Sequence, residues 1–312
     1  SRSVGQHQCE HSRLGVMAMK TRNLTRLTNK TLKIQGTLKG AGEVDTILLC
    51  SDQHFDSKDC DRKLLKRHLT EAQDKGAAIV FLGDWFDAMQ GRFDRRGSKS
   101  ALDESLLRSD YINGLIEDTT SFLEPFAKSI LGWATGNHET SILKHAEIDL
   151  VRLCIDRLAD KTDHHIEQLP YSGWLLWSYS MRNNNQDISD AVLKMAYTHG
   201  AGGGGPVTKG VIATARRATY LPDADIIVAG HIHEAWQMEL RRERLMSDGT
   251  LYQDTQWHLQ LPTYKDEYST SGDGWWHETG KGPRPIGGYW LNLKRYKERN
   301  TWKISCQPHR AL

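Results

Sequence analysis

At residues 79 to 87 the chain reads Ile-Val-Phe-Leu-Gly-Asp-Trp-Phe-Asp, an apolar run that ends abruptly in a glycine and a carboxylate. A continuous apolar run of this length is typical of a strand that is buried on both faces of a sheet. Open α/β sheets bind ligands beyond the carboxyl ends of their strands, so Asp84 is predicted to lie where a ligand can reach it. The stretch therefore predicts an α/β fold with its site at one edge of a sheet.

Four other segments repeat this arrangement of a strand-like run followed by His, Asp or Asn. They are Thr46 to Cys50 followed by Asp52 and His54, Gly132 to Thr135 followed by Asn137 and His138, Met195 to Thr198 followed by His199, and Ile226 to Ala229 followed by His231 and His233. Side chains two residues apart in an extended chain project to the same side, so the pairs in the first and last segments can each reach one ion. Carboxylate, imidazole and amide oxygen together suit Mn, Fe, Zn or a similar divalent ion. These segments contain no cysteine after the strand-like runs, which argues against a thiolate zinc site.

The order Asp-x-His, Gly-Asp-x-x-Asp, Gly-Asn-His-Glu, His and Gly-His-x-His resembles the five sequence blocks of the calcineurin-like metallophosphoesterases. All five blocks are intact between residues 52 and 233. Each block alone is a weak signal, but five in this order, each after a strand-like run, form a specific one. The resemblance implies a four-layer α-β-β-α sandwich of two mixed sheets flanked by helices. It also implies a metal-dependent hydrolase that acts on phosphate esters.

The resemblance further implies a role for each polar residue of the blocks. Asp84 is implied to bridge two divalent ions, of which one is completed by Asp52, His54 and His233 and the other by Asn137, His199 and His231. His138 is implied to lie beside the leaving oxygen as a general acid or charge stabiliser, with Asp87 orienting its imidazole. Two such ions, about 3.5 to 4 Å apart, can hold a hydroxide for in-line attack on a phosphate. Manganese is the first expectation, with Fe, Zn and Ni as alternatives.

The blocks identify the substrate less clearly than they identify the family. Protein Ser/Thr phosphatases of this superfamily continue Gly-Asp-x-x-Asp with Arg-Gly, whereas Ala88 and Met89 stand here. Gly-Asp-Trp-Phe-Asp is closer to the nuclease-like branches, and the whole resembles compact, often phage-encoded, members. The first hypothesis is therefore a phosphodiesterase that acts on small phosphodiesters or on DNA ends. The alternatives are a phosphomonoesterase that grips its phosphate with Arg92, Arg95 and Arg96, and a nucleic-acid-binding module with an inert metal site.

A glycine run at residues 200 to 205 permits a different interpretation, because it matches the Gly-x-Gly-x-x-Gly pattern of dinucleotide-binding proteins. Pro206 and the lack of an immediate amphipathic helix argue against that interpretation, which would also leave the polar strand ends unexplained. The run is instead predicted to be a flexible loop beside His199. Gly202 and Gly203 would there let backbone amides or a bulky substrate approach the metals.

Composition bounds the remaining possibilities. The chain has 312 residues, which is enough for one large α/β domain. Its formal charge is +2, so the overall charge predicts no polyanionic partner.

Residues 1–42 are basic and are predicted to form a mobile arm that leads into a strand such as Thr31 to Gln35; a nucleic-acid-binding arm is the alternative. Residues 43–312 are predicted to form a single domain with an insertion at 88–125 and aromatic-rich C-terminal strands. Helices are expected at 60–75 and at 141–159.

The cellular location is predicted from what the sequence lacks. Its apolar runs fall far short of the ~20 residues that cross a bilayer, and no apolar secretory segment follows the N-terminus. Five scattered cysteines fit a reducing compartment better than a disulfide framework. The expectation is a cytoplasmic protein without a membrane partner, and the sequence sets no expectation for its oligomeric state.

Overall fold

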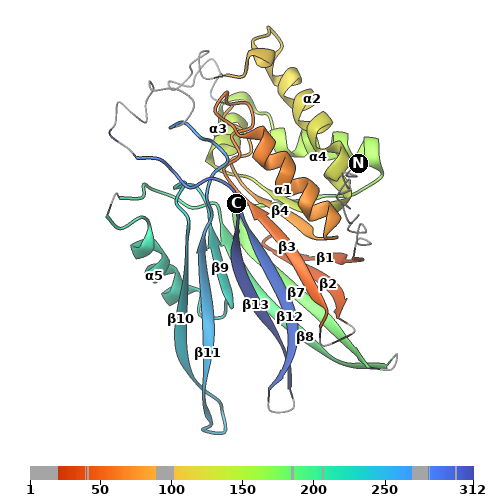
Figure 1. Ribbon diagram of the computed structural model, residues 1–312, viewed down its shortest axis with the longest axis vertical. Helices are drawn as coiled ribbons and strands as arrows, with labels where there is room; N and C mark the ends of the chain where they lie inside the picture. Colours follow the sequence, from red (N-terminus) through yellow and green to blue (C-terminus); the bar gives the residue numbers. More distant parts are fainter. Residues whose placement is uncertain are drawn as a thin grey trace, which may run out of the picture.

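The computed structural model describes residues 20–38, 40, 42–88, 102–183, 186–205, 207–268, 280, 282–298 and 301–312. Two mixed sheets pack face to face and are flanked by helices (Figure 1). The six-stranded sheet has the order β13-β12-β3-β4-β5-β6, and the seven-stranded sheet has the order β1-β2-β7-β8-β9-β11-β10. This arrangement confirms the predicted sandwich of two mixed sheets with helices.

The first sheet consists of β3 (Val44–Cys50), β4 (Ala78–Leu82), β5 (Ile130–Ala134), β6 (Glu167–Leu169), β12 (Gly288–Glu298) and β13 (Thr301–Ala311). The second consists of β1 (Asn23–Thr28), β2 (Thr31–Leu38), β7 (Ser172–Asn183), β8 (Gln186–Thr198), β9 (Ile226–Ala229), β10 (Trp236–Leu245) and β11 (Leu251–Gln260). The helices are α1 (Arg62–Asp74), α2 (Tyr111–Leu123), α3 (Asn137–Ala146), α4 (Leu150–Thr162) and α5 (Val211–Tyr220), with 3₁₀ turns at Glu104–Leu106 and Glu124–Ser129. Among the described residues, no helix is long and apolar enough to cross a membrane.

Strand β4 lies in the middle of the first sheet, parallel to both β3 and β5, and all five of its residues are buried. Ile79 and Phe81 pack toward α1, α2 and α4, whereas Val80 and Leu82 pack into the core between the two sheets. The apolar run is continuous because each face of the strand meets an apolar layer. Asp84 is thereby delivered to the sheet edge by a strand that is packed on both sides.

The core between the sheets gives a first testable prediction. Leu291 of β12 is fully buried and pairs with Ile47 of β3. Leu291→Ala is expected to lower the free energy of unfolding by about 2–5 kcal/mol, because it removes apolar contacts and leaves a cavity. Leu245→Ala is the matched control, since that side chain is 71% exposed at the end of β10 and should change stability by less than about 0.5 kcal/mol. Urea unfolding followed by circular dichroism measures both, and equal losses would contradict the assignment of this core.

The N-terminal segment differs from the sequence expectation. Residues expected to belong to a mobile arm through residue 42 form β1 and β2, and β2 pairs in parallel with β7 of the second sheet. The predicted strand from Thr31 is confirmed, and Leu32 and Ile34 pack into the core between the sheets. Both arginines of this described segment have carboxylate partners: Arg22 Nη2 lies 2.5 Å from Asp45 Oδ1, and Arg26 pairs with Glu167. Residues 1–19 lie outside the described part of the chain, so an arm there remains a prediction.

A second difference from expectation concerns residues 141–159: one helix was expected there, and the structure has two, α3 and α4. Glu147 ends α3 in a left-handed conformation with φ of 58°, and the Asp149 side chain accepts a hydrogen bond from Arg152 N at 3.0 Å to begin α4. The apolar periodicity continues through this break, so the pattern alone did not reveal it. Its cause is local capping by an acidic side chain.

Candidate metal centre

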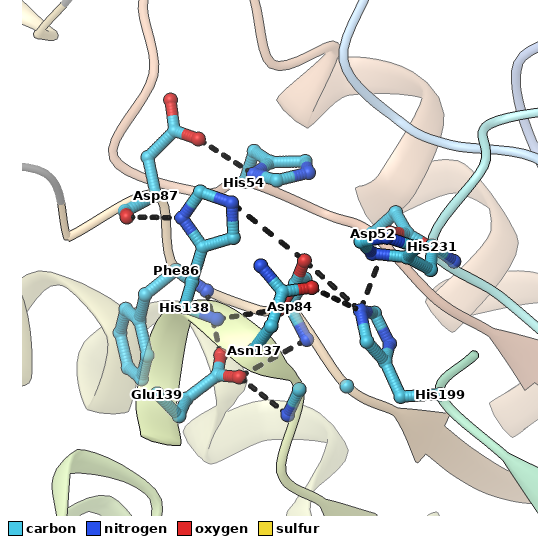
Figure 2. Close-up of polar contacts among 12 residues, drawn as sticks. Asp52, His54, Asp84, Phe86, Asp87, Asn137, His138, Glu139, His199 and His231 are labelled. Atoms are coloured by element: carbon cyan, nitrogen blue, oxygen red, sulfur yellow. Dashed lines mark hydrogen bonds and ion pairs between the residues drawn. The ribbon is translucent and has the colours of Figure 1, made fainter. Parts of the chain in front are cut away.

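The polar residues that follow β3, β4, β5, β8 and β9 converge at one edge of the two sheets (Figure 2). Three groups of side chains have ligand atoms within 4.8 Å of one another: Asp52 with His54 and His233, Asp84 with His199 and His231, and His54 with Asp87 and His138. Parallel strands end at the same edge, which is why segments far apart in sequence meet here. The first two groups contain six of the seven residues that the sequence analysis assigned as ligands.

In the first group, two ring nitrogens and a carboxylate oxygen face a common point. His54 Nε2 lies 3.1 Å from His233 Nε2, and His233 Nε2 lies 3.4 Å from Asp52 Oδ1. Asp52 Oδ1 is buried and forms no regular hydrogen bond within the part of the chain that the structure describes. A buried carboxylate oxygen facing imidazole nitrogens needs a positive partner. A divalent cation fits this donor set.

The second group is arranged around Asp84 and includes the amide that the sequence assigned. His199 Nε2 lies 3.0 Å from Asp84 Oδ2 and 3.2 Å from Asn137 Oδ1. The other ring nitrogen of His199 donates a hydrogen bond to the carbonyl oxygen of Leu82 at 3.0 Å. That bond fixes the ring so that Nε2 faces the carboxylate, which is how metal-binding histidines are commonly oriented. Oxygen and nitrogen donors of this kind suit a first-row divalent ion.

The electrostatics of the two groups are dominated by carboxylates. Burial disfavours the charged form of His199, but the carboxylates of Asp84 and Asp52 outweigh burial and raise the pKa of His199 to about 10. Burial acts to raise the pKa of Asp84, yet the imidazoles of His199 and His138 hold it well below its usual value. A cation bound beside these carboxylates would compete with protonation of His199, so metal binding would release a proton from that ring.

The backbone is strained at several of the candidate ligands. Nine described residues other than glycine have positive φ, and Asp52, His54, Asp84, His231 and His233 are five of them. Each such residue costs about 1–2 kcal/mol relative to ordinary backbone geometry. Strain that is concentrated on the residues of two ligand groups is typical of a functional site rather than of loop geometry in general.

Two glycines of the blocks lie so close to neighbouring side chains that no Cβ atom would fit. A Cβ on Gly83 would lie 2.5 Å from His199 Nδ1, and the φ of this residue is +96°. A Cβ on Gly136 would lie 2.1 Å from Asp84 Oδ1. The motif glycines therefore leave room for the ligands themselves.

The contacts of Asp87 differ from the sequence expectation. Its carboxylate was expected to orient His138, but Asp87 Oδ1 lies 2.6 Å from His54 Nδ1 and Oδ2 lies 2.9 Å from Lys265 Nζ. His138 Nδ1 instead donates to the backbone carbonyl of Asp87 at 2.6 Å. The carboxylate lies near His138 without a hydrogen bond to it, and the Asp56 side chain holds the local backbone by accepting from Asp87 N at 2.6 Å and from Ala88 N at 2.9 Å. Asp87 still holds His138, but through its main chain.

Several residues of this centre were given no role from sequence. Glu139 is buried, and its carboxylate accepts from Gly136 N at 2.6 Å and from Asp84 N and Phe86 N at 3.1 Å each. Its position three residues after Gly136, at the start of a helix, is the available signal, because that is the spacing of a capping box. Asp56 and Lys265 carried no such signal, because both lie outside the blocks and fit no motif.

Glu139→Gln is expected to weaken divalent metal binding by about 10–100-fold, the usual effect of losing a group that positions ligands. The amide would present N–H groups toward backbone N–H donors, so at least one of the three hydrogen bonds that hold the Asp84 turn would break. Equilibrium dialysis with Mn²⁺ measures the affinity. Glu124→Gln is the matched control, because that carboxylate is 46% exposed and pairs with Lys161 at the surface. Unchanged affinity in Glu139→Gln would remove Glu139 from the metal centre.

The residues predicted to bind substrate lie in two segments, of which the structure describes one. Arg92, Arg95 and Arg96 lie outside the described residues. Gly202 and Gly203 are exposed, with open space where a Cβ would be, in the loop that follows His199. Helix α5 begins only at Val211, well after this loop, as expected for a segment that is not a dinucleotide-binding turn.

Comparison with solved structures gives weak similarities of fold. A conserved uncharacterized protein of Streptococcus pneumoniae, described as a predicted phosphoesterase, is 13% identical with a TM-score of 0.30, over 86% of this chain and 100% of that one. Vacuolar protein sorting 29 of Cryptosporidium parvum is 13% identical with a TM-score of 0.34, over 86% and 98%. Vps29 of Entamoeba histolytica, complexed with Zn²⁺, is 12% identical with a TM-score of 0.33, over 86% and 99%. Values this low support no conclusion about activity.

No curated protein matches the chain. A family model does: the model of the calcineurin-like phosphoesterases matches residues 45–235. The matched range contains both ligand groups together with His138 and Asp87. A match over this much of the chain shows that the protein belongs to the calcineurin-like phosphoesterase family.

Proposed function

We propose that the protein is a phosphodiesterase that depends on two divalent metal ions, with manganese as the first candidate. The observation that carries the proposal is the meeting of two ligand groups beside Asp84, with His138 next to them (Figure 2). When bound, the two ions would activate a water and neutralise the non-bridging oxygens of the phosphate. Asp84 would bridge them, and the other six ligands would be those assigned from sequence.

His138 is the residue proposed to assist the leaving group. Its Nδ1 donates to the Asp87 carbonyl, which leaves Nε2 as the atom that can face a substrate. Nε2 lies 3.7 Å from Asp84 Oδ2, beside the proposed bridge. Burial opposes protonation, but the carboxylates of Asp84 and Asp87 raise the pKa of His138 above its usual value. An imidazolium held there can donate its Nε2 proton to a departing alkoxide.

The preference for diesters over monoesters is supported at Ala88. Protein Ser/Thr phosphatases of the superfamily carry an arginine at this position, and a monoester has an additional negative charge for such a group to bind. Ala88 is 1% exposed, and its N–H is held by Asp56. A phosphodiester needs less positive charge here, so the position favours small phosphodiesters or DNA ends as substrates.

Three of the five described basic residues in the segment of residues 1–42 do not favour the binding-module hypothesis. Lys20, Arg22 and Arg26 each pair with a carboxylate, of Glu43, Asp45 and Glu167 respectively. Guanidinium and ammonium groups engaged in this way are less available to nucleic-acid phosphates.

Hydrolysis of bis(p-nitrophenyl) phosphate, compared with p-nitrophenyl phosphate, tests the proposal. The protein is stripped of metal with a chelator and reloaded in turn with Mn²⁺, Ni²⁺, Zn²⁺ and Mg²⁺. We expect the diester to be preferred, with the highest turnover in Mn²⁺. Preference for the monoester would overturn the proposal in favour of a phosphatase that uses Arg92, Arg95 and Arg96. Absence of turnover with every metal would identify an inert site.

A further inference from the structure

A third group of ligand atoms lies beside the two that the proposed function uses. His54, Asp87 and His138 also offer atoms within 4.8 Å of one another. One carboxylate and two imidazoles form a donor set that divalent ions accept in proteins. An ion bound there would occupy His138 and draw on His54, which already belongs to the first ligand group. The centre thus contains a metal position that competes with its proposed chemistry.

An ammonium group is already bound to the carboxylate of this third group. Lys265 Nζ lies 2.9 Å from Asp87 Oδ2, while Asp87 Oδ1 faces His54 Nδ1 at 2.6 Å. The lysine side chain is only 8% exposed, and Glu267 Oε1 lies 2.6 Å from the same Nζ. Lysines are rarely buried unless paired, and this one is paired on two sides. Asp87 Oδ2 is therefore paired with the ammonium group, while Oδ1 faces the His54 ring.

The backbone around Lys265 fixes it in place. Tyr264 N donates to the carbonyl of Asp52 at 3.0 Å, and Thr263 Oγ1 donates to the same oxygen at 2.7 Å. Asp61 N in turn donates to Tyr264 O at 2.8 Å. The segment that carries the lysine is thus bound to the loop that carries the first metal-binding residues. It lies beyond the residues that the family model matches, which end at 235.

The charge of Lys265 acts selectively. Like charges that share a buried site repel strongly, because little water separates them. The partner of Lys265 is Asp87, which belongs to the third group and to neither of the other two. The ammonium therefore neutralises the one carboxylate of the third group and leaves Asp52 and Asp84 available to cations.

We propose that Lys265 excludes a third divalent ion from the group formed by His54, Asp87 and His138. The inference rests on the proposed function, because it concerns the number of ions that the same centre takes up. By holding Asp87 in an ion pair, Lys265 limits metal binding to the two groups around Asp52 and Asp84. It thereby keeps the His138 ring available to the substrate.

Equilibrium dialysis of substrate-free protein against Mn²⁺, with metal counted by elemental analysis, tests the proposal. Lys265→Met and Lys265→Gln are expected to bind one more Mn²⁺ per chain than the parent at saturation. Turnover of both variants is expected to fall as Mn²⁺ rises beyond the concentration that saturates the parent, whereas turnover of the parent stays level. Lys265→Arg keeps a positive charge and is expected to bind the same number of ions as the parent.

Glu267→Gln is the matched control, because it removes the other ion pair of Lys265 and leaves the one with Asp87. It is expected to bind as many ions as the parent. Thermal unfolding by circular dichroism confirms that each variant compared is folded. An unchanged ion number in a folded Lys265→Met or Lys265→Gln overturns the inference. Failure of the proposed function shows separately, as a parent protein that binds fewer than two ions or hydrolyses neither ester.

Discussion

Asp84→Asn is expected to lose both bound metal and nearly all turnover, the largest effect of any single substitution in this centre. The Asp84 side chain is 2% exposed, and its two oxygens face His199 Nε2 at 3.0 Å and His138 N at 3.0 Å. An amide removes the negative charge that would join two cations and turns an N–H group toward a donor. We expect turnover to fall by about 10³-fold or more, since one well-placed electrostatic group is commonly worth 10²- to 10³-fold.

Metal analysis and steady-state kinetics on the same preparation test this expectation. Asp156→Asn is the control, because that carboxylate is 52% exposed and pairs with Arg152 on the surface of α4. The control should keep the metal and turnover of the parent. An Asp84→Asn variant that retained a full metal load and lost only turnover would contradict the bridging role.

His138→Asn is expected to keep the metal and to lose about 10²- to 10⁴-fold in turnover, the range for loss of a general acid. The ring belongs to neither of the two proposed ligand groups, so its removal leaves them complete. A shorter side chain cannot place a proton donor where Nε2 lies. His145→Asn is the matched control, because it lies on the same helix and is exposed.

The leaving group distinguishes the two roles considered for His138. A phenyl ester leaves as a more basic oxygen than a p-nitrophenyl ester, so it depends more on proton donation. If His138 is the general acid, His138→Asn should slow the phenyl diester by a much larger factor than the p-nitrophenyl diester. Equal factors would assign His138 to charge stabilisation, and turnover equal to the parent would remove it from the reaction.

Much of the fold was predictable because the signals are local. The apolar run from Ile79 and the polar residue after it indicated a buried strand followed by a carboxylate, and the strand ends at Leu82, two residues before Asp84; the Asp84 side chain is itself buried. The convergence of the candidate ligand residues was predictable because they follow strands that end at one edge. Spacing along the chain was sufficient for these features.

The features that could not be predicted from the sequence depend on contacts between segments that are distant along the chain. The Asp87 carboxylate lies against His54 and Lys265. The Asp56 side chain accepts a hydrogen bond from Asp87 N, and this bond holds the local backbone. Lys265 follows the last block by more than thirty residues, and no motif connects it to Asp87. The break between α3 and α4 was missed for a different reason, because side-chain capping there leaves the apolar periodicity intact.

The order of strands in the first sheet has a consequence for how the protein is made. Strand β12 lies between β13 and β3, so β3, which leads into Asp52 and His54, gains its second neighbour only after the chain has been synthesised beyond residue 298. Lys265 likewise reaches Asp87 late in synthesis. Pairings between such distant segments form slowly, because a long loop must close first. A nascent chain therefore carries all the candidate ligands well before β12 can pair with β3, and until then that edge of β3 is unpaired.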